Sequence, residues 1–276
     1  MIRMEHVSFS YSDQGPTVQD LSFHVEKGEF VAILGANGAG KTTTVRLIDG
    51  LIRPTAGRVL IHDADTAVSP VSERARRVGF LFQNPDRQIC KNTVREEILF
   101  GLKTVRGDES EEILNARCEQ VLKDFHFTGE EEPFSLSRGQ RQRVALASIL
   151  AVEPEVLILD EPTTGLDYLE CCHIMDRIRR MNQEQQVTVI MVCHDMEVVL
   201  DYASRVLVMA GGRLLADGPV KEVFRNIGLM EEASILPPQM IGLSLRLGEG
   251  FEQADTPETM ADAILSRMAE GGKRHV

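Results

Sequence analysis

The start of the chain alternates apolar and polar residues in three short segments. Residues 2–34 contain turn-forming residues at 13–16 and the alternating apolar positions Val7, Phe9, Leu21, Phe23, Val25, Val31 and Ile33. A period of two predicts half-buried strands separated by turns. The third segment runs into a glycine-rich turn, after which residues 41–49 have helical character. We therefore expect three strands, then a glycine-rich turn that leads into a helix.

The spacing of apolar residues becomes helical between about residues 93 and 151. One stripe there contains Val94, Ile98, Leu99 and Leu102, and another contains Ile113, Cys118, Val121 and Leu122. Strand patterns occur before this region at 58–61 and 78–82 and after it at 156–159 and 187–193, with a helix at 168–181. A strand, a helix and a further strand in succession predict parallel strands joined by a crossover. We expect an α/β protein with a helical subdomain inserted into its sheet.

The pattern changes again beyond about residue 224. Residues 235–238, Ile-Leu-Pro-Pro, interrupt any helix, and residues 248–256 are typical of a loop. A final helical stripe contains Met260, Ile264, Leu265 and Met268. We expect residues 226–276 to form a small C-terminal appendage.

Composition favours a large globular domain and disfavours a nucleic-acid partner. The 276 residues are 43% hydrophobic, which is enough to bury a sizeable core. The formal net charge of -12 disfavours a broad phosphate-binding surface. The apolar runs are shorter than the about 20 residues that a membrane span needs, and the N-terminus lacks the apolar region of a secretory signal. The chain is expected to stay in the cytosol.

The cysteines are Cys90, Cys118, Cys171, Cys172 and Cys193, and none belongs to a CxxC pair. In a cytosolic protein they are expected to be reduced structural thiols. A redox pair formed by the adjacent Cys171 and Cys172 is the alternative.

Residues 35–42, Gly-Ala-Asn-Gly-Ala-Gly-Lys-Thr, fit the phosphate-binding pattern GxxxxGK[ST] between a strand and a helix. In such a loop, backbone N–H groups and the helix N-terminus surround the phosphates of a nucleotide. Lys41 is expected to reach the β- and γ-phosphates of ATP, and Thr42 to ligate Mg²⁺. A plain strand-to-helix turn needs neither three glycines nor a Lys-Thr pair. The predicted nucleotide-binding positions here are Gly35, Asn37, Gly38, Ala39, Gly40, Lys41, Thr42 and Thr43.

The apolar strand at residues 156–159 ends in two carboxylates, Asp160 and Glu161. This order suits an aspartate that holds Mg²⁺, directly or through water, followed by a glutamate that polarises the attacking water. Alone, the pair is equally consistent with a solvated turn. Its position downstream of a phosphate-binding loop favours the functional interpretation.

Residues 136–140, Leu-Ser-Arg-Gly-Gln, resemble the LSGGQ signature of the ABC ATPases, and the resemblance covers about residues 1–225. It implies a P-loop NTPase fold with a mostly parallel core sheet, an N-terminal antiparallel β subdomain and a helical subdomain at about 84–151. It also implies that Ser137, Gly139 and Gln140 contact ATP presented from outside the chain, through a hydroxyl and free helix N–H groups. An ordinary helix capped by Ser137 is the local alternative.

Four further positions match the ABC pattern. The resemblance implies that Gln83 senses Mg²⁺, that His194 contacts the γ-phosphate and that Asp167 works across a dimer interface. Taken alone, a glutamine such as Gln83 is usually a surface residue and a histidine at a strand end, such as His194, is usually structural. The alternative for Asp167 is a helix cap. Tyr11 is expected to stack on adenine, with core packing as the alternative.

The family pattern also implies a partner chain, because its members pack head to tail with each nucleotide between the loop of one chain and the signature of the other. The partner is a second ABC ATPase, identical or paralogous. Arg138 replaces the first glycine of the signature. The partner's nucleotide site, which this signature is expected to complete, therefore departs from the family pattern. Because Ser137 and Gly139 are kept, we expect activity to be tuned and not lost, and Arg138 favours a paralogue.

Residues 82–89 and 93–101 are similar to the Q-loop region of the energy-coupling factor ATPases, which drive uptake of vitamins and of cobalt or nickel ions. Residues 236–240 resemble the C-terminal segment that helps those ATPases dimerise. The resemblance implies two membrane partners, a scaffold subunit and a substrate-binding subunit, at the cytoplasmic face of the membrane. Asp86, Glu96 and Glu97 are candidates to receive basic side chains of the scaffold, and a solvated acidic face is the alternative.

Three other functions remain open at this point. One is an ATPase of another ABC transporter, and one is a non-transport ABC ATPase that acts on ribosomes or DNA. The third is a regulatory nucleotide-binding module without turnover, against which the presence of Glu161 argues.

Overall fold

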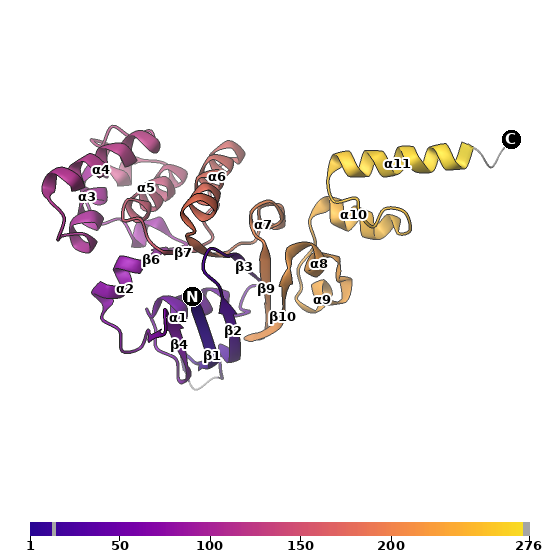
Figure 1. The fold of residues 1–276 in the computed structure, drawn as a ribbon, viewed down its shortest axis with the longest axis horizontal. Helices are drawn as coiled ribbons and strands as arrows, with labels where there is room; N and C mark the ends of the chain where they lie inside the picture. Colours follow the sequence, from indigo (N-terminus) through magenta and orange to yellow (C-terminus); the bar gives the residue numbers. More distant parts are fainter. Residues whose placement is uncertain (13–14, 273–276) are drawn as a thin grey trace.

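A six-stranded sheet forms the centre of the protein in a computed structural model that describes residues 1–12 and 15–272 (Figure 1). The strand order is β10-β9-β3-β8-β7-β6, and neighbours are parallel except for β10, which is antiparallel to β9. The strands are β3 (Phe30–Leu34), β6 (Val78–Leu81), β7 (Val156–Asp160), β8 (Thr188–Val192), β9 (Arg205–Ala210) and β10 (Arg213–Pro219).

Both faces of this sheet are covered. In β3, Ala32 and Leu34 belong to one hydrophobic cluster, whereas Val31 and Ile33 belong to another. Every residue of β3, β7 and β8 is buried, which explains why their sequences are continuous apolar runs.

The N-terminal strands form a second sheet, which is antiparallel. Its order is β2-β1-β4-β5, from β1 (Ile2–Phe9), β2 (Val18–Val25), β4 (Ala56–Ile61) and β5 (Ala64–Asp65). Helix α1 (Lys41–Asp49) contacts β4 of this sheet and β7 and β8 of the central one. The predicted mostly parallel core and N-terminal antiparallel subdomain are therefore both confirmed, and the third of the early strands, β3, belongs to the core.

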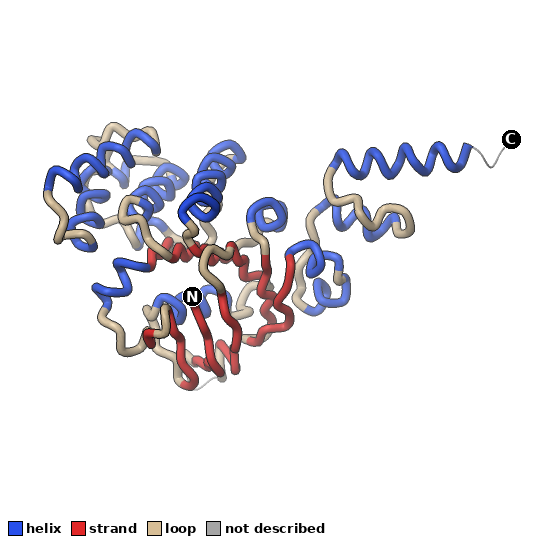
Figure 2. Tube along the Cα trace, viewed as in Figure 1, coloured by secondary structure: helices blue, strands red, loops and turns tan. Residues whose placement is uncertain are grey.

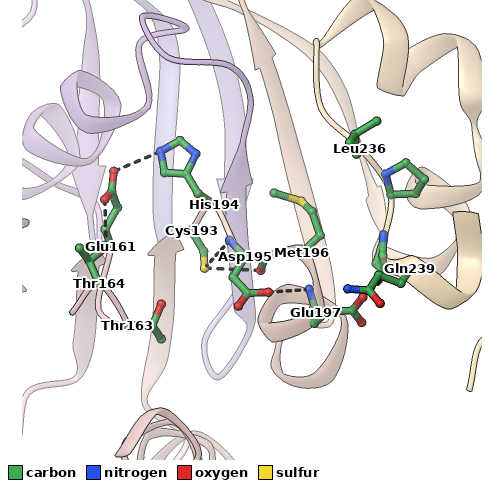
Figure 3. Close-up of a pocket in the computed structure, with 12 residues that line it drawn as sticks. Glu161, Thr163, Thr164, Cys193, His194, Asp195, Met196, Glu197, Leu236 and Gln239 are labelled. Carbon is green, nitrogen blue, oxygen red and sulfur yellow. Dashed lines mark hydrogen bonds and ion pairs between the residues drawn. The ribbon is translucent and has the colours of Figure 1, made fainter. Parts of the chain in front are cut away.

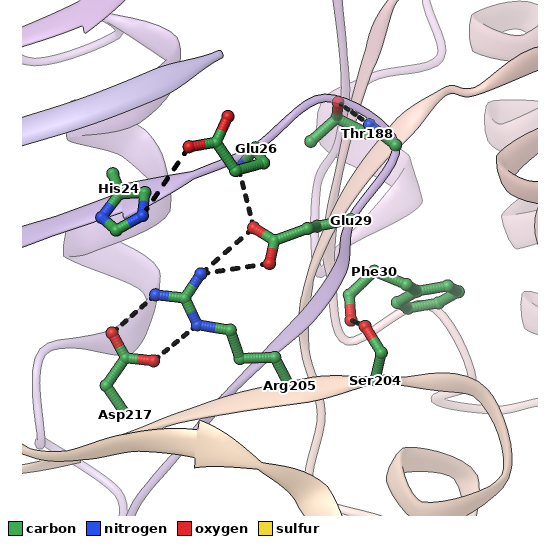
Figure 4. A network of polar contacts seen from close by, with 9 residues as sticks. His24, Glu26, Glu29, Phe30, Thr188, Ser204, Arg205 and Asp217 are labelled. Carbon is green, nitrogen blue, oxygen red and sulfur yellow. Dashed lines mark hydrogen bonds and ion pairs between the residues drawn. The ribbon is translucent and has the colours of Figure 1, made fainter.

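An arginine fixes the end of the central sheet (Figure 4). The Arg205 guanidinium donates to both carboxylate oxygens of Asp217, at 2.6 and 2.7 Å, and to the carboxylate of Glu29 at 3.1 Å. These two carboxylates raise the pKa of Arg205. The contacts tie β9 to β10 and to the turn before β3, and so hold the strand that leads into the glycine-rich loop.

Three helices gather at one end of the molecule (Figure 2). They are α3 (Val94–Val105), α4 (Glu111–Asp124) and α5 (Arg138–Leu150), and α6 (Tyr168–Gln185) lies beside them. A short helix α2 (Val71–Arg77) precedes β6, and 3₁₀ turns occur at Pro85–Arg87 and Pro133–Ser135. Thr93, Ser110 and Ser137 accept a hydrogen bond from the backbone at the start of α3, α4 and α5, which explains why these helices begin there.

One predicted apolar position in this region is wrong. Ile113 was expected on the buried stripe of α4, but it is 50% exposed. Leu114 takes its place, because positions 114, 118, 121 and 122 follow the four-, seven- and eight-residue spacing of one helix face.

The chain after β8 is mostly helical. It contains α7 (Met196–Tyr202), α8 (Val220–Arg225), α9 (Ile227–Glu232), α10 (Gln239–Leu247) and α11 (Pro257–Gly272). Met230 and Ile241 belong to the main hydrophobic cluster, so the core is continuous across residue 225. Phe251, Ala254 and Met260 form a separate small cluster. On the predicted stripe of α11, Met260 is buried but Ile264, Leu265 and Met268 are exposed.

None of the helices within residues 1–12 and 15–272 is long and apolar enough to cross a membrane. All five cysteines are free, including the adjacent Cys171 and Cys172. Burial raises the pKa of the Cys118, Cys171 and Cys193 thiols to about 11, so these side chains stay protonated at neutral pH.

Candidate nucleotide site

The phosphate-binding loop, residues 35–42, connects β3 to α1 and needs glycine at two positions. Gly35 has a φ of +145°, and a Cβ there would lie 2.1 Å from the carbonyl oxygen of Met209. Gly40 has a φ of +99° and begins α1 without a side-chain cap. The N–H groups at the start of α1 are therefore left to a ligand, and an anion is the ligand that they favour.

Lys41 folds back over this loop. Its Nζ donates to the carbonyl oxygens of Gly35, at 2.8 Å, and Ala36, at 3.0 Å. Burial lowers the pKa of Lys41, while the carboxylates of Glu161 and Asp160 act in the opposite direction. The ammonium group is thus partly desolvated and positioned over a loop whose shape suits phosphate.

Thr42 and Asp160 bring two oxygen atoms together beside the loop. The Thr42 Oγ1 donates to Asp160 Oδ1 at 3.1 Å, and Asp160 is buried at the end of β7. Burial raises the pKa of Asp160, although the hydrogen bond from Thr42 opposes that shift. A hydroxyl and a carboxylate are the hard ligands that Mg²⁺ prefers, so the donor set fits this ion.

Gln83, the third predicted magnesium ligand, lies in the loop after β6. Its side chain is exposed and forms no hydrogen bond to any residue within 1–12 and 15–272. No hydrogen bond joins its side chain to Thr42 or Asp160.

Glu161 and His194 face each other across the ends of β7 and β8 (Figure 3). His194 Nε2 lies 3.1 Å from Glu161 Oε1, and Thr164 Oγ1 donates to Glu161 Oε2 at 3.2 Å. The backbone of Glu161 is left-handed, with a φ of +55°, which costs a non-glycine residue about 1 kcal/mol or more. Its N–H donates to the carbonyl oxygen of Val192 at 2.9 Å, which holds this conformation and directs the carboxylate toward the histidine.

The signature segment forms a capped helix start. Ser137 Oγ accepts the backbone N–H of Gln140 at 3.2 Å, and Gln140 Oε1 accepts the N–H of Ser137 at 2.9 Å. A Cβ at Gly139 would lie 2.8 Å from the carbonyl oxygen of Gly165, so only glycine allows α5 to approach that loop. The exposed Arg138 lies against Gly165 as well. Ser137 therefore caps α5, as the local alternative predicted, and the cap uses the amide oxygen of Gln140.

Asp167 follows that loop and begins α6. Its carboxylate accepts the backbone N–H of Glu170 at 2.8 Å, so it caps the helix. The side chain is exposed and shares its surface with Tyr168 and Leu169, which are 81% and 67% exposed.

Tyr11 lies at the edge of the phosphate-binding loop. It is 57% exposed, which makes the core-packing alternative wrong. Its ring stands edge-on to Phe9 with centroids 4.7 Å apart, and its hydroxyl lies 3.5 Å from Thr43 Oγ1. An exposed aromatic ring next to the loop is available to a flat ligand.

Glu97 is not a docking carboxylate, which corrects one of the predictions. It is 4% exposed, and its Oε2 accepts the backbone N–H groups of Cys90 and Lys91, both at 2.9 Å. The charge of Glu97 therefore stabilises the turn before α3. The prediction failed because acidic sequence spacing does not show which carboxylate has backbone donors within reach.

Sequence reasoning also missed the contacts that join the loop after β6 to the signature helix. Gln88 Oε1 accepts the N–H of Phe82 at 3.3 Å, and its Nε2 donates to the carbonyl oxygen of Ala145 at 3.2 Å. Asp86 Oδ1 lies 2.7 Å from Arg141 Nε. These roles become visible only when the folded chain brings distant segments together. The sequence signal was a run of polar residues between two apolar stretches, which is typical of side chains that bond to the backbone.

Comparison with known proteins identifies the family of this chain. The family description "ABC transporter" matches residues 18–164, which is more than half of the chain and includes the phosphate-binding loop, the signature and Glu161. The chain belongs to the ABC transporter family. Its fold is that of the family's ATPases: it superposes on cbiO1 of Clostridium perfringens, described as part of the ABC transporter complex cbiONQ, with a TM-score of 0.73 and 32% identity over 88% of this chain and 97% of that one.

Two further proteins are similar to this ABC ATPase over much of its length. The energy-coupling factor transporter ATP-binding protein EcfA2 of Clostridium tetani is 36% identical over 95% of this chain and 94% of its own. The ATP-binding cassette MJ0796, described as a dimer in a post-hydrolysis state with ADP and Pi, superposes with a TM-score of 0.73 and 28% identity over 80% of this chain and 99% of its own.

Five other curated relatives are putative ABC transporter ATP-binding proteins that are 37–42% identical to this chain. The chain spans only 40–48% of their length.

Proposed function

We propose that this ABC ATPase binds ATP on its phosphate-binding loop and hydrolyses it with Glu161 as the group that polarises water. The observation that carries the proposal is the position of Glu161, which is held by Val192 and Thr164 and faces His194 at 3.1 Å. A partly buried, oriented carboxylate next to a phosphate cradle suits general-base chemistry. His194 then contacts the γ-phosphate, and Tyr11 stacks on the base.

Thr42, Asp160 and Gln83 are the residues proposed to hold Mg²⁺. The ion supplies positive charge that neutralises the β- and γ-phosphates. Lys41 supplies a second positive charge from the protein, since its Nζ already lies on the loop carbonyls.

The proposed partner in hydrolysis is a second ABC ATPase, identical or paralogous. Ser137, Gly139, Gln140 and Asp167 would then serve the nucleotide of that partner. Support comes from the contact of Gly139 with Gly165, which puts the signature and the loop before Asp167 on one face. The exposed apolar residues Phe134, Tyr168 and Leu169 come from the same two segments, and the similar cassette MJ0796 is described as a dimer. Arg138 would tune the partner's site.

The wider role that we propose is that of the ATPase of an energy-coupling factor importer for vitamins or transition-metal ions. The chain would work at the cytoplasmic face of the membrane with a scaffold subunit and a substrate-binding subunit, and residues 226–276 would help the ATPases dimerise. Support comes from EcfA2 of Clostridium tetani, which matches nearly end to end, and from cbiO1.

Affinity purification tests this role. Tagged Glu161→Gln chain is isolated from detergent-solubilised membranes with Mg·ATP, and mass spectrometry identifies the proteins that accompany it. Recovery of a second ABC ATPase with small integral-membrane proteins supports an energy-coupling factor complex. Recovery of ribosomal or DNA-associated proteins, or of no membrane protein, overturns the transport role but leaves the ATPase chemistry.

Replacing Asp86 by arginine should weaken docking to the membrane subunits and spare ATP binding. Asp86 is exposed on the loop after β6, where it also pairs with Arg141. It is proposed to receive basic side chains of the scaffold subunit, so arginine at this position places like charges across the docking interface. Like charges across an interface cost several kcal/mol, so recovery of the membrane subunits should fall about tenfold or more. Glu112→Arg makes the same charge change at an exposed position of α4 and serves as the control. Normal co-purification with the Asp86→Arg variant contradicts this docking site.

A further inference from the structure

The start of α10 is hydrogen-bonded to the helix that follows His194 (Figure 3). The backbone N–H of Gln239 donates to Glu197 Oε1 at 2.7 Å. Among residues 1–12 and 15–268, no other hydrogen bond or ion pair joins residues 226–268 to residues that precede α8. Lys221 and Arg225 of α8 pair with Asp255 at 2.6 and 3.7 Å, so the side chain of Glu197 makes the polar connection between the C-terminal segment and the elements that precede α8.

A short turn centred on Asp195 joins His194 to Glu197 and is held by side-chain hydrogen bonds to its backbone. Asp195 Oδ1 accepts the N–H groups of Glu197, at 3.0 Å, and Val198, at 3.3 Å. The buried Cys193 Sγ accepts the N–H of Asp195 at 3.4 Å from the other side of His194. These bonds hold the backbone on both sides of His194, so we expect a displacement of the first turn of α7 to move His194 with it.

The buried Val198 and Val199 anchor α7 in the core, but open space borders the turn after His194 on the side of the C-terminal segment. A cavity of about 510 Å³ separates Glu161 and His194 from residues 236–239, Leu-Pro-Pro-Gln. A second cavity, of about 530 Å³, lies against Leu236, Pro237 and Gln239 and is otherwise lined by α9 and α10. The 236–239 segment is thus bordered by open space at two places, and the contact between Gln239 and Glu197 is what fixes it to α7.

We infer that Glu197 and the backbone N–H of Gln239 are positioning groups for ATP hydrolysis. By holding α7, they keep His194 at the distance from Glu161 that the reaction needs. The inference rests on the proposed hydrolytic role of Glu161 and His194. The C-terminal segment of the chain thereby supports its own catalytic site. Because neither group touches the phosphate-binding loop, their loss lowers kcat and leaves the KM for ATP unchanged.

Proline at position 239 removes the donor with little other disturbance. Gln239 is the first residue of α10, where proline fits a helix and its missing N–H breaks no helical bond. Pro238 has a φ of -50° and an extended ψ of 150°, which is the conformation that a following proline requires. We expect Gln239→Pro to lower kcat by about tenfold with the KM within about twofold of wild type. Gln239→Ala keeps the N–H and is the matched control.

Variants at Glu197 complete the test, with steady-state hydrolysis measured on the full chain together with any ATPase that co-purifies. Glu197→Ala should lower kcat as Gln239→Pro does, and Glu197→Gln, which keeps an acceptor oxygen, should restore most of it. The double variant should be no slower than either single one, because both remove the same contact. Thermal unfolding in the absence of nucleotide identifies any variant that is merely unfolded.

Three results overturn the inference: both single variants keep kcat within about twofold, their losses multiply in the double variant, or kcat/KM falls through KM alone. Absence of hydrolysis by the wild-type chain with its partner instead overturns the proposed ATPase function, so the two failures are distinguishable.

Discussion

The Glu161→Gln variant should hydrolyse ATP about 10²–10⁴-fold more slowly than the wild-type chain while binding ATP normally. An amide has nearly the shape of the carboxylate, so it can keep the contacts with Thr164 and His194. It cannot accept a proton from water, and it lacks the negative charge that polarises water. Phosphate release at saturating Mg·ATP, measured on the assembled ATPase pair, gives the rate, and equilibrium titration gives the ATP affinity.

The matched control for this change is Glu184→Gln, at an exposed position of α6 with the same loss of charge. It should keep wild-type activity. Undiminished hydrolysis in Glu161→Gln would show that the catalytic assignment is wrong and would favour a regulatory module without turnover.

The Lys41→Ala variant should lose ATP binding by a factor of about 100 or more. Its ammonium group donates hydrogen bonds to two carbonyl oxygens of the loop. A bound phosphate can replace these oxygens as the acceptor. Hydrogen bonds to charged groups contribute about 1.5–3 kcal/mol each, and about 1.4 kcal/mol corresponds to a tenfold change in affinity. Equilibrium titration with ATP measures the loss, and Lys27→Ala, at an exposed position, is the control.

The same variant has a second readout, which separates a lost ligand contact from a damaged fold. Burial lowers the pKa of Lys41, which means that the folded protein disfavours its charged form. Removing the ammonium group should therefore leave the nucleotide-free protein at least as resistant to thermal unfolding, while the extra stability gained on adding ATP disappears. A strongly destabilised apo protein, or a normal rise in unfolding temperature with ATP, contradicts the assigned role.

Local patterns predicted much of the fold and of the site. The alternating residues of β1 and β2, the apolar runs of β3, β7 and β8 and the helical stripes of α3 and α4 are visible because backbone periodicity is a local property. The phosphate-binding loop is equally local, since Gly35 and Gly40 are required by their own backbone angles and contacts. These signals predicted the α/β class and a phosphate site that includes Lys41 and Thr42.

Other features depended on which distant segments meet. Ile113 and Leu114 are adjacent apolar residues on α4, and the packing of that helix decides which of them is buried. Glu97 resembled a surface acid in the sequence, yet it lies buried under two backbone N–H groups.

The sequence by itself determined the chemistry of the site: the glycines, the Lys-Thr pair, and the carboxylates at the end of a strand. Only the tertiary structure decided how these groups are held, namely Glu161 against His194, Thr42 against Asp160, and Glu197 against the N–H of Gln239. The physical reason is that motif residues act through their own chemical type and local backbone. Supporting contacts join distant residues, such as Thr42 and Asp160, which are 118 positions apart. A polar side chain does not reveal its partner until the chain has folded.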